Sequence, residues 1–314
     1  MSETNELHVI IGASGATGRL VVRELLARGK RVRAVNRSGR AEVPVGVEVL
    51  AGDATDPGRM REVCRGATVV YHWAMLLFRR WVAMFPPMTE GIIEGAAAAG
   101  ARLVFADDTW MYGKVNAPMT EDLPPRPVSG KGILRAWLAE MLLRAHESGK
   151  VPTTIGRAAE LYGPSVQSLL ARNVFVPALQ GKKARWIGDP DVPLTPTYIE
   201  DFARGLVVLA EHEEALGEVW HVPTYEPTTG REFVRAIFEE AGHPPKIGAL
   251  GGSAVRALGL VWPLAREGAE IVYQFEQPFV LDDGKFVRAF GGAATPYREG
   301  IRRTVEWYHR DLAK

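Results

Sequence analysis

The 314-residue chain lacks several features that mark particular classes of protein. A single cysteine, Cys64, excludes an internal disulfide framework, and the seven histidines show no zinc-ligand spacing, so we expect no structural metal. No apolar run reaches transmembrane length, and the N-terminus carries acidic residues where a secretory signal needs basic ones. The formal net charge of +1 gives no field that would recruit nucleic acid or an anionic membrane. These absences predict a cytoplasmic protein without nucleic-acid or membrane partners.

What the chain does contain is the composition of a globular protein, with 46% hydrophobic and 24% charged residues. In the first half, segments typical of strands alternate with segments typical of helices. The expected strands are 7–11, 31–35, 47–50, 68–71, 102–106 and 153–155, and the expected helices are 16–28, 57–66, 89–99 and 133–146. This alternation predicts an α/β fold, a doubly wound parallel Rossmann sheet whose ligand crevice lies at the carboxyl ends of the strands.

The second half is divided into short pieces by seven prolines between Pro164 and Pro227, and only 202–211 and 231–241 read as clear helices. We interpret it as a smaller C-terminal α/β substrate domain. The predicted dinucleotide-binding domain comprises 1–160 and 197–219, and the predicted substrate domain comprises 161–196 and 220–314.

A glycine-rich turn, GASGATG, connects the first expected strand to the first expected helix. Gly12 allows a tight turn, Gly15 lets backbone amides approach a pyrophosphate, and Gly18 permits close packing of helix on strand. The alternative is a plain turn with incidental glycines, but a position between strand and helix favours dinucleotide binding. The predicted cofactor contacts in this turn are Gly12, Ser14, Gly15, Ala16, Thr17 and Gly18.

The second strand ends in Asn36 and Arg37. An NAD-preferring site has a carboxylate near this point to hold the ribose hydroxyls, whereas a guanidinium suits a 2′-phosphate. The sequence therefore favours NADP(H) as the cofactor, with Arg37 as the phosphate contact. The alternative is that Arg37 and Arg40 are solvated loop charges.

Later motifs extend this pattern, and together they resemble the extended short-chain dehydrogenase/reductase family, which includes NAD-dependent epimerases and dehydratases. The resemblance covers nearly the whole chain and rests on GASGATG, GDATD at 52–56, YHWA at 71–74, Tyr112-Gly113, RAAELYGP at 157–164, TYIEDFA at 197–203 and GEVWHV at 217–222. It implies a Rossmann sheet with a small C-terminal substrate domain, further cofactor contacts at Asp53, Ala54, Trp73 and Ala74, and a homodimer formed through paired helices.

The usual catalytic triad of this family is missing. Its members use a Tyr, a Lys four residues later and a Ser or Thr at a preceding strand end, because the Lys lowers the pKa of the phenol that passes a proton as hydride moves. Counting back from Glu140 in the long helix, these positions fall on Gly132, Ala136 and Asp108. An epimerase or dehydratase mechanism therefore cannot be carried over.

Several side chains near the vacated positions are candidates to replace the triad. Asp108, Tyr112 and Lys131 are the catalytic candidates, and Asp108 requires a pKa raised by burial in order to act as an acid. Thr109 in the same loop is a predicted substrate contact, and Arg135 lies one helical turn beyond Lys131. The alternative is that Asp107 and Asp108 cap a turn, and that Lys131 is solvated or contacts a ribose.

Two further positions and one segment are assigned to the substrate. Glu160 is expected to bind an amine or alcohol or to act as a base, unless it pairs with Arg157 or another cation. Tyr162 is expected to form a wall of the pocket. The segment 73–88 is rich in Met, Leu, Phe and Trp, which suits an apolar substrate, although such a stripe also suits a core or a subunit interface.

The sequence thus predicts an NADP(H)-dependent oxidoreductase that acts on the carbonyl, alcohol or imine of a largely apolar small molecule and uses a non-standard proton donor. A catalytically silent NADP(H)-binding sensor or regulator is the first alternative, because the triad is lost. A sugar-nucleotide epimerase or dehydratase is the second, although the apolar segment and the missing Tyr and Lys weigh against it.

Overall fold

The structure is a computed structural model that describes residues 6–74, 80–261, 266 and 268–312. It divides into two compact units. The first unit comprises Met1–Asp108, Leu134–Arg157 and Phe202–Val222, and the second comprises Thr109–Ile133, Ala158–Asp201 and Pro223–Lys314. The second unit is as large as the first, because residues 109–133 group with it and not with the sheet to which the sequence pattern assigned them.

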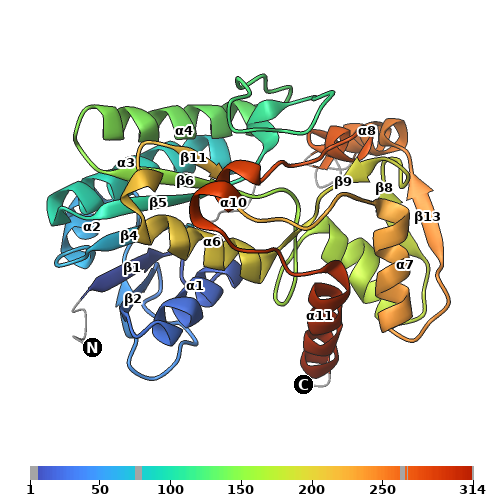
Figure 1. Cartoon of the computed structure of the whole chain (residues 1–314), viewed down its shortest axis with the longest axis horizontal. Coiled ribbons are helices and arrows are strands. Elements are labelled where there is room, and N and C mark those ends of the chain that lie inside the picture. Colours follow the sequence, from blue (N-terminus) through green and yellow to red (C-terminus); the bar gives the residue numbers. More distant parts are fainter. Residues whose placement is uncertain (1–5, 75–79, 262–265, 267, 313–314) are drawn as a thin grey trace. The chain divides into compact units, whose positions relative to one another are not determined.

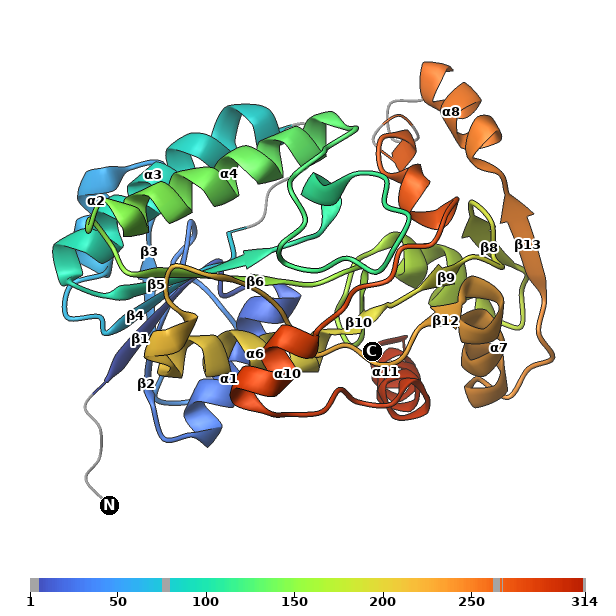
Figure 2. The same cartoon turned by 45° about the horizontal axis from the view of Figure 1, so that its top comes forward.

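The first unit is built on a seven-stranded parallel sheet with the strand order β11-β6-β5-β4-β1-β2-β3. Figures 1 and 2 together label its strands, which are β1 (Leu7–Ile11), β2 (Arg31–Asn36), β3 (Glu48–Ala51), β4 (Val69–His72), β5 (Arg102–Asp107), β6 (Thr153–Arg157) and β11 (Val219–His221). All five residues of the interior strand β1 are buried, as a parallel strand covered on both faces requires. The expected Rossmann-type sheet is confirmed.

Helices cover both faces of this sheet (Figures 1 and 2). One face carries α1 (Ala16–Ala27) and α6 (Ile199–Glu211), and the other carries α2 (Pro57–Val63), α3 (Trp81–Ala99) and α4 (Gly130–Glu147). Asp56 caps α2 by accepting a hydrogen bond from the Arg59 N–H at 3.0 Å, as its sequence predicts. Helix α3 begins earlier than the predicted residue 89, and Pro86 and Pro87 lie inside it.

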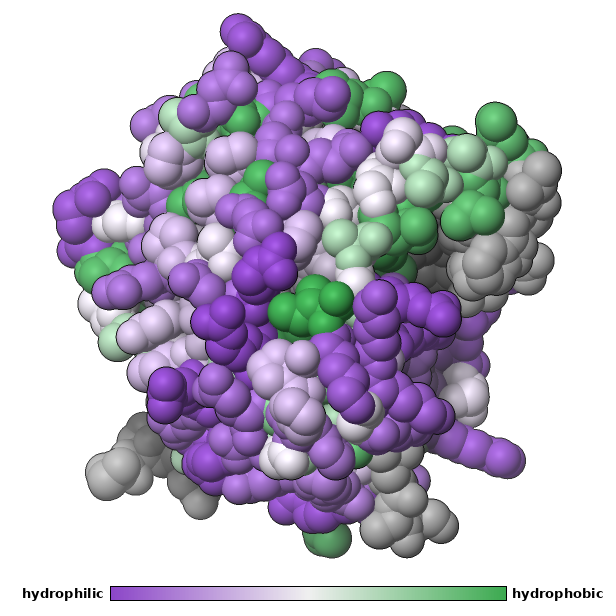
Figure 3. All heavy atoms as spheres, turned by 90° about the vertical axis from the view of Figure 1, so that its right-hand side faces the viewer, coloured by the Kyte–Doolittle hydropathy of each residue, from purple (hydrophilic) through white to green (hydrophobic). Residues whose placement is uncertain are grey.

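The second unit holds short strand pairs and helices around an aromatic core. Its elements are η2 (Trp110–Tyr112), β7 (Leu161–Tyr162), η3 (Ala171–Phe175), α5 (Val176–Leu179), β8 (Ala184–Ile187), β9 (Pro193–Leu194), β10 (Thr197–Tyr198), β12 (Thr228–Thr229), α7 (Gly230–Glu240), β13 (Ile247–Leu250), α8 (Gly252–Val261), η5 (Val272–Phe275), α10 (Gly284–Phe290) and α11 (Tyr297–Leu312). The sequence pattern missed α5, α8, α10 and α11. Figure 3, which faces the side with α7, α8 and β13, shows a mostly hydrophilic surface with scattered hydrophobic patches.

Candidate functional site

The turn between β1 and α1 packs against Trp73, the residue that follows β4. A Cβ added to Gly12 would lie 2.3 Å from the Trp73 carbonyl oxygen, and one added to Gly18 would lie 2.6 Å from the Gly12 oxygen. Gly12 also has a φ of +96°, which only glycine adopts without strain. At Gly15 an added Cβ would approach the Trp73 indole nitrogen at 3.3 Å. The turn therefore has the close backbone approaches that the glycine spacing predicts.

The N-terminus of α1 has the features of an anion site. Gly15 is the N-cap residue and no side chain caps the first turn, so its amides keep hydrogen-bonding capacity for a ligand. Ser14 is exposed, Ala16 is half-buried, and the hydroxyl of Thr17 is buried without a hydrogen-bond partner among the described residues. A pyrophosphate fits these groups, because the positive end of the helix dipole points toward it.

The end of β2 is organised by the amide of Asn36. Its Nδ2 donates to Ser14 Oγ at 2.6 Å and to the Arg40 carbonyl at 2.8 Å, while its Oδ1 accepts from the Ser38 N–H at 3.1 Å. These bonds tie the loop after β2 to the glycine turn. Arg37 is exposed in this loop, and the neutral Asn36 stands where an NAD-type site has a carboxylate.

Asp53 lies in the loop after β3, where the family resemblance placed a cofactor contact. Its Oδ1 accepts from the Thr55 N–H at 3.0 Å and from the Thr55 hydroxyl at 2.8 Å. These two bonds lower the pKa of Asp53, and the nearby charge of Arg37 lowers it further. The neighbouring Ala54 is buried, and its carbonyl oxygen would lie 2.1 Å from a Cβ added to Gly91 of α3.

The apolar segment 73–88 is divided in the structure. Trp73 is half-buried and makes an edge contact with Phe202, with ring centroids 5.5 Å apart, and Ala74 follows it beside Gly12. Met75, Leu76, Leu77 and Phe78 lie outside the described residues. Trp81, Phe85 and Met88 are buried in the first unit, so these three belong to the core, as the alternative interpretation of the stripe expects.

A cluster of four charged side chains lies at the carboxyl ends of β5 and β6. Asp107 and Arg157 are register partners in the sheet, and Arg157 Nε donates to Asp107 Oδ2 at 3.0 Å. Arg135 of α4 lies 3.5 Å from Asp107 Oδ1 through one terminal nitrogen, and its Nε lies 2.8 Å from Asp108 Oδ2. Two carboxylates and two guanidiniums therefore share one buried cluster without excess charge, as burial of ions requires.

The structure leaves no room for a side chain at Gly132, the position to which the family resemblance assigned a tyrosine. A Cβ at this position would lie 2.5 Å from the Trp110 carbonyl oxygen and 3.1 Å from Pro127 Cβ. The backbone of η2 thus occupies the space into which a side chain on this helical turn would extend. A tyrosine at position 132 is excluded by backbone packing within the second unit.

Five residues singled out from the sequence lie in the second unit. Thr109 and Tyr112 are buried in η2 and its preceding turn, and Lys131 is buried with its Nζ 3.7 Å from Glu270 Oε2. Glu160 is half-buried, and its backbone oxygen accepts from the Thr197 N–H at 2.9 Å.

Tyr162, the predicted pocket wall, lies in the aromatic core of the second unit. Its ring lies 5.0 Å from the ring of Phe233 and 5.4 Å from that of Tyr198. Burial raises the pKa of Tyr162 well above its ordinary value, and its hydroxyl has no hydrogen-bond partner among the described residues.

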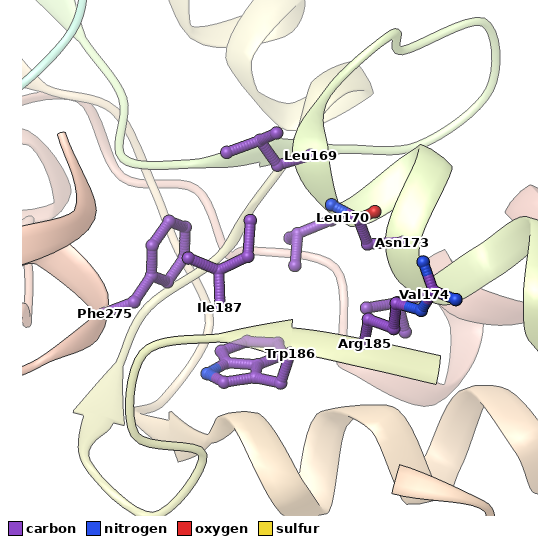
Figure 4. A pocket seen from close by; sticks show the side chains of 8 residues that line it. All are labelled: Leu169, Leu170, Asn173, Val174, Arg185, Trp186, Ile187 and Phe275. Atoms are coloured by element: carbon purple, nitrogen blue, oxygen red, sulfur yellow. The ribbon is translucent and has the colours of Figure 1, made fainter. Parts of the chain in front are cut away.

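A separate pocket in the second unit is lined mainly by apolar side chains (Figure 4). Its empty volume is about 210 Å³ including the part open to solvent, and its lining residues are Leu169, Leu170, Asn173, Val174, Arg185, Trp186, Ile187 and Phe275. They come from the π-helical segment η3 and the residues before it, from β8 and from η5. Figure 4 shows Arg185 beside Val174 at one end and Phe275 beside Ile187 at the other.

Sequence reasoning missed this pocket and the role of Arg157. The pocket residues come from segments without a chemical motif, and their shared surface arises only from the pairing of β8 with β13 and the packing of η3 on β8. The pairing of Arg157 with Asp107 follows from the register of β5 and β6. The predicted strands ended at residues 106 and 155, before Asp107 and Arg157. The sequence pattern therefore gave no indication that these two residues are partners.

Comparison with known proteins gives consistent relatives. A sequence model of the NAD dependent epimerase/dehydratase family matches residues 8–222. A 4-hydroxy-2-methyl-3-oxo-4-farnesyl-3,4-dihydroquinoline-1-oxide ketoreductase from Stigmatella aurantiaca is 27% identical, over 93% of this chain and 93% of its own. A 2-alkyl-3-oxoalkanoate reductase from Stenotrophomonas maltophilia is 26% identical, over 82% of this chain and 84% of its own.

Solved structures agree on the fold. The dTDP-glucose 4,6-dehydratase of Bacillus anthracis, determined in complex with NAD, superposes with a TM-score of 0.81 at 17% identity and covers 98% of each chain. Among the residues that the structure describes, no helix is both long and apolar enough to span a membrane.

Proposed function

Because the chain belongs to the NAD dependent epimerase/dehydratase family, we propose that it is an NADP(H)-dependent oxidoreductase acting on a largely apolar small molecule. The reacting group would be a carbonyl, an alcohol or an imine. When bound, the dinucleotide supplies or accepts hydride at its nicotinamide. The observation that carries the proposal is the end of β2, where a neutral Asn36 is tied to the glycine turn and Arg37 is exposed beside it.

The chain's own residues would hold the cofactor in a defined way. The amides at the start of α1 bind the pyrophosphate, and Arg37 binds the 2′-phosphate that distinguishes NADP from NAD. Asp53 is kept ionised by its hydrogen bonds from Thr55, and the charge of Arg37 lies near it. Trp73 and Ala74 would flank the dinucleotide beside the glycine turn.

An apolar substrate is supported by two relatives. Their names describe reduction of a keto group on molecules that carry farnesyl or alkyl chains. Thr109 and Glu160 remain the proposed polar contacts to the substrate, and Asp108, Tyr112 and Lys131 remain the proposed catalytic groups.

Calorimetric titration of the purified protein with NADPH and NADH tests the proposal. We expect NADPH to bind more tightly, and Arg37→Ala to weaken NADPH at least tenfold while changing NADH little, because a charge-assisted phosphate contact is worth about 1.5–3 kcal/mol. Arg23→Ala, which removes an exposed charge from α1, is the matched control. Equal affinities for both nucleotides in the wild type would contradict the NADP(H) preference, and no binding of either would contradict the cofactor.

A catalytically silent NADP(H)-binding sensor or regulator is a second candidate, and Gly132 favours it, because the backbone of η2 excludes the family's tyrosine there. NADPH consumption with a panel of long-chain ketones and imines separates the two. Turnover that is lost in Tyr112→Phe supports the enzyme, and tight NADPH binding without consumption of any carbonyl supports the sensor. Binding of a UDP-hexose would instead support a sugar-nucleotide epimerase or dehydratase.

We also propose a homodimer. Helices α3 and α4 cover the same face of the sheet (Figures 1 and 2), and each carries a large exposed apolar side chain: Val82 of α3 is 73% exposed and Trp137 of α4 is 49% exposed. An exposed apolar face on two neighbouring helices is a surface that a second copy of the chain would cover.

A further inference from the structure

The charged cluster of the first unit is centred on Arg135, which is only 3% exposed. Its guanidinium lies over the rings of Trp81, Phe85 and Phe105, at 4.8, 5.1 and 5.8 Å from their centroids. These rings remove water from the cation and stabilise it through their π faces. A guanidinium does not lose its proton in a protein, so this buried group is a permanent positive charge.

Asp108 is the member of the cluster that reaches the surface. Its carboxylate lies 2.8 Å from Arg135 Nε and its side chain is 19% exposed, whereas the side chain of Asp107 is fully buried between Arg135 and Arg157. A permanent cation at this distance stabilises the charged form of the carboxyl group. Within the first unit, Arg135 from α4 faces Asp108 directly, and through Arg135 the carboxyl group is linked to Asp107 of β5 and its partner Arg157 of β6.

Asp108 also stands where the family places a Ser or Thr, which can both donate and accept a hydrogen bond. An ionised carboxylate only accepts. Asp108 directly follows the last residue of β5. It therefore lies at the carboxyl edge of the sheet, where ligands of this fold bind.

We propose that Asp108 is a substrate-recognition carboxylate, and that Arg135 is the residue that positions it and keeps it ionised. Asp108 then selects substrates that carry a hydrogen-bond donor, a hydroxyl or a protonated nitrogen, beside the reacting carbon. It does not donate the proton in a reduction, which leaves that role to Tyr112 or Lys131. The recognition step rests on the proposed function, whereas the charge of Asp108 does not.

The charge is tested by ¹³C NMR of the aspartate carboxyl groups in the full chain, with the Asp108 resonance assigned by its loss in Asp108→Asn. We expect the chemical shift of a carboxylate throughout the range from about pH 5 to about pH 8, well above the ordinary aspartate value. Arg135→Lys keeps a cation and preserves this behaviour, whereas Arg135→Met moves the titration into that range. A protonated Asp108 at neutral pH in the wild type, or an unchanged titration in a folded Arg135→Met variant, would overturn the proposal. If Arg135→Met does not fold, the wild-type titration is followed below pH 5, and a midpoint at or above the ordinary aspartate value of about 3.9 would overturn the role of Arg135.

Recognition is tested by calorimetry of the NADP⁺-loaded protein, which cannot reduce a ketone, with 3-hydroxyheptan-2-one, 3-aminoheptan-2-one and heptan-2-one, which differ only in the donor beside the carbonyl carbon. We expect the hydroxyketone and the aminoketone to bind at least tenfold more tightly than heptan-2-one, and Asp108→Asn to abolish the preference for the aminoketone. Equal affinities, or no binding of either donor, would overturn the recognition role. Failure of NADPH to bind would instead count against the proposed function and leave the NMR result standing.

Discussion

At the scale of single residues, Gly132 shows most directly how tightly the start of α4 packs against η2. A methyl group at this position meets the Trp110 carbonyl oxygen at 2.5 Å, whereas a methyl group at Gly130, on the same helix, has only Glu270 Oε2 at 3.6 Å within contact distance. Gly132→Ala should therefore lower the free energy of unfolding by about 1–3 kcal/mol, the usual cost of overpacking.

Urea denaturation measures this difference. Gly130→Ala is the matched control and should be neutral or stabilising, because alanine favours the helix and meets open space. If the two substitutions have equal effects, backbone packing does not explain the loss of the tyrosine.

Two buried histidines make stability depend on pH. Burial lowers the pKa of His8 to about 4 and that of His72 to about 3, with a further contribution from the charges of Lys30 and Arg135 respectively. Both values lie below the ordinary histidine pKa of about 6.5. At a pH between the lowered pKa and 6.5, the unfolded chain therefore binds more protons than the folded chain. Their contribution to stability is complete above about pH 6.5 and is lost as the pH falls toward 4 and 3.

Each histidine should cost about 1.4 kcal/mol of unfolding free energy per pH unit in this window. Urea unfolding at a series of pH values from neutral to about pH 5 measures the slope. His8→Gln should remove the contribution of one histidine to this slope. His309→Gln, at an exposed position of α11, should leave the slope unchanged. A stability that does not vary over this range would contradict the burial of these neutral imidazoles.

At the scale of elements, the segment before the pocket stores backbone strain. Ser165 has a φ of +64°, and it is the one described residue other than glycine with a positive φ. A side chain in this region costs about 1 kcal/mol relative to glycine, and such strain is concentrated at functional sites. Ser165→Gly should therefore raise the free energy of unfolding by about 0.5–1 kcal/mol.

Thermal unfolding detects this gain. Ser165→Ala keeps a Cβ in the same conformation and serves as the control, so it should show no gain. A destabilised Ser165→Gly would mean that the hydroxyl contributes more than the strain costs.

Element boundaries show which sequence signals are reliable. The sheet strands of the first half follow their apolar runs within a few residues, because each buried run has a single place in a parallel sheet. The start of α3 was predicted too late, since Pro86 and Pro87 read as helix breakers although they lie inside the helix. Helix α11 was missed because its polar residues outnumber the apolar ones that face α7.

At the scale of the whole molecule, the proposed homodimer makes a simple prediction. Trp137→Glu places a charge in the exposed apolar face of α3 and α4 and should convert a dimer to monomers, because an unpaired charge is costly in an interface. Sedimentation velocity measures the change. Val45→Glu, in the fully exposed loop before β3, is the control and should leave the dimer intact. A monomeric wild type would contradict the proposal.

The glycine turn and the strand order were predictable because local chemistry fixes them. Gly12, Gly18 and Asn36 lie where their residue types indicate. The cluster of Arg135 with Asp107 and Asp108 was not predictable from the sequence. It joins a helix to a strand end, and the two are far apart in the chain. Asp108 was predicted as an acid from its position alone, whereas the neighbouring guanidinium is the basis for our proposal that it stays ionised.

The interleaving of the two units has a consequence for synthesis on the ribosome. Strand β11 pairs with β6 through Val219 and Ile155, yet residues 158–201 of the second unit emerge between them. The sheet therefore cannot be completed until part of the second unit has already left the exit tunnel, so we expect the units to mature together and not in sequence. A nascent chain paused between these strands would expose the open edge of β6, which is the surface a chaperone would need to protect.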